Sequence, residues 1–266
     1  KAWHPTLWAR GKQARISSNA SSREKSKTGQ EAKAIFTGQI IRQSKQDEAP
    51  MLAYNAFMSI QTKRGISIAI LVAAILGEGF GLTLSFLRQG DPYLYFTILG
   101  NAFYGLVALV LLAVEIACLA KKKKLPRWAY VLHYVGTVCE TITLFTVCLL
   151  LVWQQGPGLL YEGAFPFLHL LCPLLALANH YFFLGRSDYR YTDGGFGFIP
   201  VLAYAVAIIP LSACGIVKPV YPFLDFRANS WWLTLLYAVG ALVLLWLICY
   251  VLIRYGRKAQ GLTEKE

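Results

Sequence analysis

The chain has 266 residues, of which 56% are hydrophobic, 14% aromatic and 15% charged, and its formal net charge is +12. An ordinary soluble domain carries roughly 45–50% apolar and about 25% charged residues, so this composition excludes a soluble surface, a disordered chain and a small disulfide-rich protein. The basic residues stand in short blocks between long apolar runs, which is typical of a membrane protein rather than of a nucleic-acid-binding face.

The first segment, residues 1–60, is interpreted as a basic N-terminal tail. Residues 1–50 are polar, rich in Ser, Lys and Arg, and contain no run that could span a membrane. They also lack the apolar stretch of a secretory signal. Three interpretations stay open: a disordered cytoplasmic tail, an organelle-type presequence, and sequence upstream of the true start. We favour a disordered tail or an upstream extension.

Six apolar runs follow and set the expected architecture. Their approximate bounds are 66–87, 94–120, 128–153, 163–184, 196–217 and 231–253. A helix needs about 20 predominantly apolar residues to cross about 30 Å of hydrocarbon, and each run is long enough. Because the connecting loops are short, neighbouring helices must be antiparallel. We therefore expect an all-α, polytopic membrane bundle of six transmembrane helices over residues 61–256, with a C-terminal tail at 257–266.

The Lys and Arg residues of the loops predict the orientation. One set of loops is basic, at residues 121–127, 186–190 and 254–265, whereas the opposite set carries only Arg88, Lys218 and Arg227. Cytoplasmic loops of membrane proteins are enriched in Lys and Arg. We therefore expect an integral, multi-pass protein with both termini in the cytoplasm.

Small residues inside the runs point to helix packing. All six cysteines lie within expected spans, without Cys-x-x-Cys spacing, so we interpret them as packing residues. Gly77 and Gly81 form a Gly-x-x-x-Gly pattern, which indicates close helix packing more often than dimerisation.

Polar side chains inside the spans are the informative ones, because ionisable groups are costly in hydrocarbon. Helical spacing places them on one stripe in each of the second, third and fourth spans. The stripes hold Thr97, Asn101, Tyr104 and Glu115, then His133, Thr137, Glu140 and Thr143, then His169, Cys172, Asn179 and His180, while Glu78 lies in the first span. Three polar stripes need a shared interior, so we expect a central polar seam or cavity.

Depth divides these residues into two layers. At 1.5 Å per residue, Thr97 lies about 5 Å and His169 about 9 Å below the outer surface. Glu115, His133 and His180 all lie within about one and a half turns of the cytoplasmic ends of their spans, and they form an inner polar cluster.

Each layer has two interpretations. A His base beside a Thr hydroxyl makes Thr97 and His169 a candidate nucleophile pair, but the Thr would otherwise bond its own helix backbone. The inner cluster has the chemistry of a metal or proton site. We favour a hydrogen-bonded structural group there, since no close motif such as His-x-x-x-His is present. No metal or other cofactor is expected.

Three segments together resemble a known family. They are Tyr95–Asn101, the stretch from His169 through Pro173 to Asn179, and Tyr221-Pro222-Phe223-Leu224-Asp225. With six spans and cytoplasmic termini, they are similar to the androgen-induced protein family of six-span membrane proteins, which includes the androgen-dependent TFPI-regulating protein and bacterial relatives. The resemblance covers roughly residues 60–258. Bacterial relatives commonly carry Asp where this chain has Asn179.

The resemblance implies a lipid ester hydrolase. Animal members hydrolyse fatty-acid esters of hydroxy fatty acids with an intramembrane Thr and a His, and these roles fall on Thr97 and His169. Asn101, one turn below Thr97, would serve as an oxyanion donor, and Asp225 would orient His169 if its loop folds inward. Asn179 is a further supporting residue. The implied partners are membrane lipids and an amphipathic lipid ester, with no nucleic acid.

Two other classes of function stay open. In a small proton-coupled transporter or a lipid-binding membrane protein without catalysis, a proton path would use Glu78, Glu115, Glu140, His133 and His180. The third class is a non-catalytic membrane scaffold. The sequence shows no inverted repeat of the kind found in many transporters.

Overall fold

A computed structural model describes residues 60–88, 92–152, 156–184, 189–218 and 229–258, together with Tyr221 and Asp225. The expectations for residues 1–59 and 259–266 lie outside the described residues.

Every regular element of the described chain is helical, as predicted. The α-helices are α2 (Ile60–Arg88), α3 (Phe96–Ala120), α4 (Arg127–Thr146), α6 (Cys172–Ala178), α7 (Phe198–Ala213) and α8 (Trp231–Lys258). Three 3₁₀ segments are η1 (Pro92–Leu94), η3 (Pro157–Tyr161) and η6 (Tyr191–Gly197). Three π-helical segments are η2 (Val147–Leu151), η4 (Pro166–Leu171) and η5 (Asn179–Leu184).

Five stretches of the described chain are long and apolar enough to cross a membrane. They are Gln61–Arg88, Phe96–Ala120, Arg127–Leu149, Tyr191–Ala213 and Trp231–Arg257. These stretches coincide with the first, second, third, fifth and sixth apolar runs, and they fit an integral multi-pass membrane protein.

The fourth run, 163–184, is helical but irregular. Its central α6 has π-helical turns on both sides, in η4 and η5. Pro166 and Pro173 lack the N–H that an α-helix needs and crowd the preceding turn, which gives a local reason for the wider backbone winding. This run is not among the five stretches that meet the length and hydropathy of a span.

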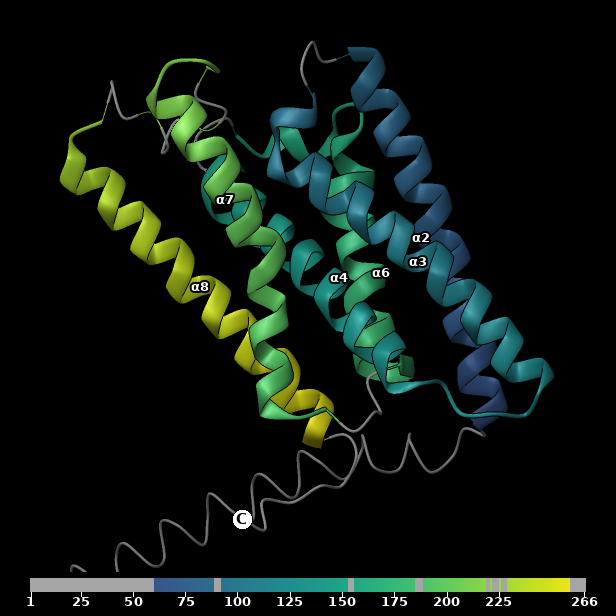
Figure 1. The fold of residues 1–266 in the computed structure, drawn as a ribbon. Helices are drawn as coiled ribbons and strands as arrows, with labels where there is room; N and C mark the ends of the chain where they lie inside the picture. Colours follow the sequence, from purple (N-terminus) through teal and green to yellow (C-terminus); the bar gives the residue numbers. More distant parts are fainter. Residues whose placement is uncertain are drawn as a thin grey trace, which may run out of the picture. The chain divides into compact units, whose positions relative to one another are not determined.

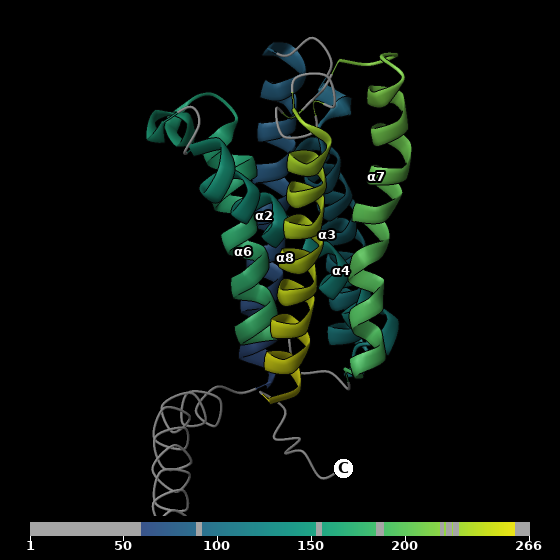
Figure 2. The same cartoon turned by 90° about the vertical axis from the view of Figure 1, so that its left-hand side faces the viewer.

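The central helix of the bundle is α4. It packs against α3, α6 and α8, while α2 lies along α3 and along the η4–α6–η5 run. In its most apolar stretch 61% of the residues are buried, against 17–33% in the other four. Figure 2 shows α8 between α6 and α7, on the side of the bundle opposite α2.

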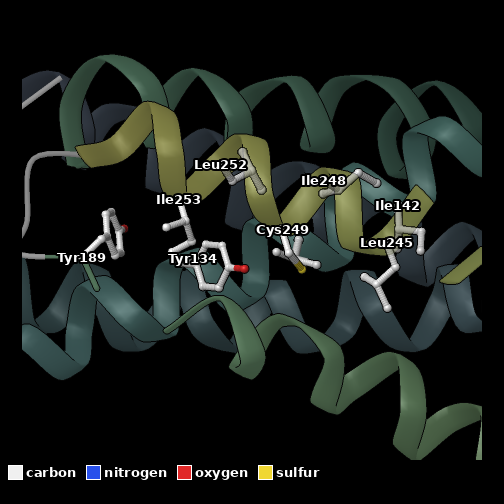
Figure 3. Close-up of a cluster of buried hydrophobic side chains, with 9 residues drawn as sticks. Tyr134, Ile142, Tyr189, Leu245, Ile248, Cys249, Leu252 and Ile253 are labelled. Carbon is white, nitrogen blue, oxygen red and sulfur yellow. The ribbon is translucent and has the colours of Figure 1, made fainter. Parts of the chain in front are cut away.

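The largest apolar cluster joins α8 to α4. Its members are Tyr134, Val138, Ile142, Tyr189, Leu245, Ile248, Cys249, Leu252 and Ile253 (Figure 3). The α8 members recur at spacings of three and four residues, so they form one stripe of the helix. A Cβ on Gly197 would lie 2.7 Å from the Cys249 sulfur and 2.9 Å from the Tyr134 hydroxyl, so only glycine fits at this junction.

Gly77 and Gly81 pack inside the bundle, as expected. A Cβ on Gly77 would lie 2.9 Å from the Cys172 sulfur, and one on Gly81 would lie 2.6 Å from the Leu168 side chain. The pattern therefore brings α2 against the η4–α6 run of the same chain.

The antiparallel order brings the end of α3, the start of α4 and the end of α8 to one end of the bundle (Figure 1). We call this end, which carries residues 121–127, the basic end, and the opposite one the far end. At the basic end Arg127 donates hydrogen bonds of 2.6 and 2.9 Å to the buried Asp193 carboxylate, which also accepts from the Arg190 N–H at 2.9 Å. These contacts fix η6 against the start of α4.

Candidate functional site

Thr97 lies in the first turn of α3, at the far end, and its exposed fraction is 4%. The first N–H groups of a helix have no partner within the helix. The Thr97 N–H donates instead to the Tyr221 hydroxyl, at 3.4 Å. The phenol also lies beside the Thr97 side chain, and burial raises the pKa of Tyr221 to about 12, so the hydroxyl keeps its proton at neutral pH.

Aromatic side chains cover this end of α3. The rings of Tyr95 and Tyr221 meet edge to face at 6.0 Å, and those of Phe96 and Tyr204 do so at 5.3 Å. The Tyr204 hydroxyl donates to the Leu94 carbonyl at 2.8 Å, so α7 is held against the α3 start. We call Tyr95, Phe96, Tyr204 and Tyr221 the aromatic collar.

Sequence reasoning missed Tyr204 and Tyr221 as site residues. Tyr221 opens the Tyr-Pro-Phe-Leu-Asp segment, in which the sequence indicates the Asp225 carboxylate as the functional group. In the structure the Asp225 carbonyl accepts from the Asn229 N–H at 2.9 Å. Its expected action on His169 stays a prediction.

Asn101 is fully buried one turn below Thr97 on α3. Its side-chain amide donates to the Thr97 carbonyl, and its Oδ1 has no hydrogen-bond partner in the described chain. The helix itself thus uses one N–H of the Asn101 side-chain amide. At the neighbouring Gly100, an added Cβ would lie 3.6 Å from Cys139 and 3.7 Å from the Thr143 hydroxyl, so α4 packs closely on α3 there.

His169 lies on η4, and its exposed fraction is also 4%. The ring stacks on Phe165 with centroids 4.5 Å apart, and the Phe165 backbone is its hydrogen-bond partner. The neighbouring residues Ile98 and Leu168 pack in one small apolar cluster. Thr97 and His169 therefore stand on adjacent elements at the same end of the bundle, α3 and η4.

No hydrogen bond joins Thr97 to His169 among the contacts of the described chain. Their coupling therefore stays a prediction. Apo geometry of a catalytic pair is often longer than in the substrate complex. Asn179, at the junction of α6 and η5, is fully buried, and both polar atoms of its side chain lack a hydrogen-bond partner within the described part.

The inner cluster residues make two separate contacts, and the expected approach of Glu115 to the two histidines stays a prediction. The rings of His133 and His180 lie 5.8 Å apart, and His180 Nε2 is 3.2 Å from the Leu252 carbonyl, to which its N–H tautomer donates. Glu115 lies 3.6 Å from Arg64 Nε, on α2. Spacing within single helices does not indicate this arginine, because α2 brings it alongside α3.

Two further findings concern metal binding and similarity to known proteins. In the described ranges no three His, Cys, Asp or Glu side chains are grouped so that they could hold a metal ion. No family model, curated protein or solved structure matches this chain. The resemblance to the androgen-induced protein family accordingly stays a prediction.

Proposed function

We propose that the chain is an intramembrane hydrolase of lipid esters, with Thr97 as the nucleophile and His169 as the base. The observation that carries the proposal is the far-end arrangement: a buried hydroxyl in the first turn of α3, a phenol against it, and a buried imidazole on the adjacent η4. The proposal follows the family resemblance and adds Tyr221 to the site.

The proposed topology has six spans and cytoplasmic termini. The run from Pro166 to Leu184 would be the fourth span, and its 19 residues extend about 28 Å at the α-helical rise, which approaches the hydrocarbon thickness. An even number of spans places the start of α2 and the end of α8 on one side. The Lys-rich turn at 121–124 would then be cytoplasmic.

The chemistry is covalent acyl transfer. His169 takes the proton of the Thr97 hydroxyl, and the Thr oxygen attacks the ester carbonyl. The tetrahedral oxyanion accepts a hydrogen bond from the Tyr221 hydroxyl, whose oxygen itself accepts from the Thr97 N–H at the positive end of the α3 dipole. The alkoxide leaves with the proton held by His169, and water then releases the acid from the acyl-enzyme.

A fluorophosphonate probe tests the nucleophile. It reacts with an activated hydroxyl, and we expect labelling of Thr97 in purified protein in lipid nanodiscs and none in Thr97→Ala. Thr83→Ala is the matched control, because this exposed threonine only donates to the Gly79 carbonyl, at 2.7 Å. Equal labelling of wild type and Thr97→Ala would refute the assignment.

Lipid binding without catalysis is the second candidate, and a groove near the basic end favours it. The groove has a volume of about 740 Å³, within the range of roughly 300–1,000 Å³ that is usual for ligand sites. Its walls include Phe103, Val131, Val135, Ile199 and Pro200, with Arg127 and Asp193 also lining it. If this groove carries the function, Val135→Trp should reduce the lipid that copurifies with the protein, while Thr97→Ala should not.

A further inference from the structure

Four carboxylic acids are buried in the described chain, and they differ in how their charge is compensated. Glu115 and Asp193 each form an ion pair with an arginine. Glu78 and Glu140, with exposed fractions of 1% and 0%, have no salt bridge in the described ranges. The Cys172 thiol is the hydrogen-bond partner of Glu78, and the two carboxyl oxygens of Glu140 have no partner there.

The two uncompensated acids lie together, although they come from α2 and α4. Their carboxyl groups are close enough to interact electrostatically, and Tyr104 of α3 lies near both. Tyr104 is fully buried, and its hydroxyl has no hydrogen-bond partner within the described chain. Glycines allow the approach: a Cβ on Gly105 would be 3.4 Å from the Glu78 Cβ, and one on Gly136 only 2.8 Å from the Tyr104 ring.

The other titratable groups facing the pair are thiols. Cys172 of α6 lies near both carboxyl groups, and Cys139 lies near Glu140. A thiol and a phenol are neutral when protonated, so they do not compensate two carboxylates. Side by side in an apolar interior, two carboxylates repel each other and lose their hydration. Since no lysine or arginine pairs with them in the described part, the compensating charge must come from solution.

We propose that Glu78, Glu140 and Tyr104 form a proton-binding site near the middle of the bundle, in which the carboxyl pair holds at least one exchangeable proton. Paired carboxyl groups that cannot both ionise share a proton in this way. The site contains neither Thr97 nor His169, so it stands independently of the proposed hydrolase.

A line of buried rings gives the proton a route from the basic end. Ring centroids are 6.4 Å apart from Tyr104 to His133, 5.8 Å from His133 to His180, and 5.7 Å from His180 to Tyr189. Each of these rings is exposed by 3% or less. Imidazole takes a proton on one nitrogen and releases one from the other, and such spacings suit transfer directly or through one bridging water.

Infrared difference spectroscopy of the full chain in liposomes tests the site. A protonated carboxyl group absorbs apart from a carboxylate, and its band shifts in D2O if the proton exchanges. We expect wild type to show a protonated-carboxyl band at neutral pH, where exposed carboxyl groups are ionised. This band should exchange in D2O and disappear as the pH rises further. The double variant Glu78→Gln/Glu140→Gln should lack this band. Glu115→Gln is the matched control and should keep the band, because it leaves the Glu78–Glu140 pair intact.

The wild-type measurements decide the proposal without relying on how a variant folds. Absence of the band at neutral pH, where exposed carboxyl groups are ionised, would overturn it. So would a band that neither exchanges nor titrates, since the acids would then be fixed structural groups. Exchanging potassium for sodium at constant pH and ionic strength should leave the band unchanged. Loss of the band in sodium would make the occupant Na⁺ and overturn the assignment to a proton.

His180→Phe tests the route. It removes one transfer step and should slow the D2O exchange at least about tenfold without removing the band. Exchange at the wild-type rate would overturn entry along this line of rings.

Discussion

At the scale of single residues, Tyr221 connects a loop far along the chain to the start of α3. Its hydroxyl accepts from the Thr97 N–H at 3.4 Å and lies beside the Thr97 side chain. The same hydroxyl has a proton to donate when negative charge develops on a substrate oxygen. In the proposed mechanism, Tyr221 therefore both positions the start of α3 and stabilises the oxyanion.

Tyr221→Phe removes this hydroxyl and keeps the ring of the aromatic collar. We expect kcat for ester hydrolysis to fall about 100-fold, because loss of one oxyanion donor costs about 10²–10³. Tyr204→Phe is the control: its hydroxyl bonds the Leu94 carbonyl, so its loss should cost about 1 kcal/mol of stability and leave kcat near wild type. Equal losses of kcat in both variants would indicate damage to the collar rather than loss of a donor.

Spacing within one helix predicts which of its residues share a buried side. It does not predict contacts between segments that are far apart in the chain. Periodicity alone placed Thr97, Asn101 and Tyr104 on one buried side of α3, and the structure agrees. The partners of Tyr221 and Glu115 depend on which segments pack alongside α3, and spacing within one helix does not encode that. For the same reason the sequence grouped Glu78 and Glu140 in one possible proton path but did not indicate that their carboxyl groups face each other.

At the scale of elements, apolar length predicted five of the spans well, while prolines altered the fourth. The continuous apolar run at 163–184 predicts an ordinary α-helical span. The structure instead has π-helical turns on both sides of α6. Composition does not distinguish such winding from α-helix, because hydropathy is the same in both. The irregular turns carry His169 and Asn179, in keeping with the tendency of π-bulges to occur at functional sites.

Close packing at Gly197 is the element-level prediction. An added methyl group in Gly197→Ala meets the Cys249 sulfur and the Tyr134 hydroxyl where α4, η6 and α8 join. We expect a loss of about 1–3 kcal/mol in stability from overpacking, measured as a lower midpoint of thermal unfolding in detergent. Gly195→Ala in the same 3₁₀ segment has open space around its Cβ and should unfold as wild type does. Similar midpoints for the two variants would contradict the packing account.

At the scale of the whole molecule, the polar interior runs along the bundle between two different ends. The far end holds Thr97 and the aromatic collar, whereas the basic end holds the Arg127–Asp193 ion pair and the last ring of the line from Tyr104. The bundle thus separates the proposed ester chemistry from the proposed proton route.

Topology is the prediction at this scale. Single cysteines introduced at Lys123 and at Gly158, in a variant without the native cysteines, should react differently with a membrane-impermeant thiol reagent added outside cells. The positive-inside bias predicts labelling at position 158 and protection at 123 until the membrane is opened. Labelling at 123 in intact cells would reverse the orientation and place Thr97 near the cytoplasmic surface.

Hydrolysis of a long-chain lipid ester by the purified full chain tests the central claim most directly. Wild type, Thr97→Ala, His169→Ala and the double variant are compared in nanodiscs under one set of conditions. If the two residues act as a unit, each single variant should lose at least about 100-fold in kcat/KM and the double variant should be little worse. Thr97→Ser should retain part of the activity, because it keeps a hydroxyl. Wild-type activity in Thr97→Ala would contradict the account.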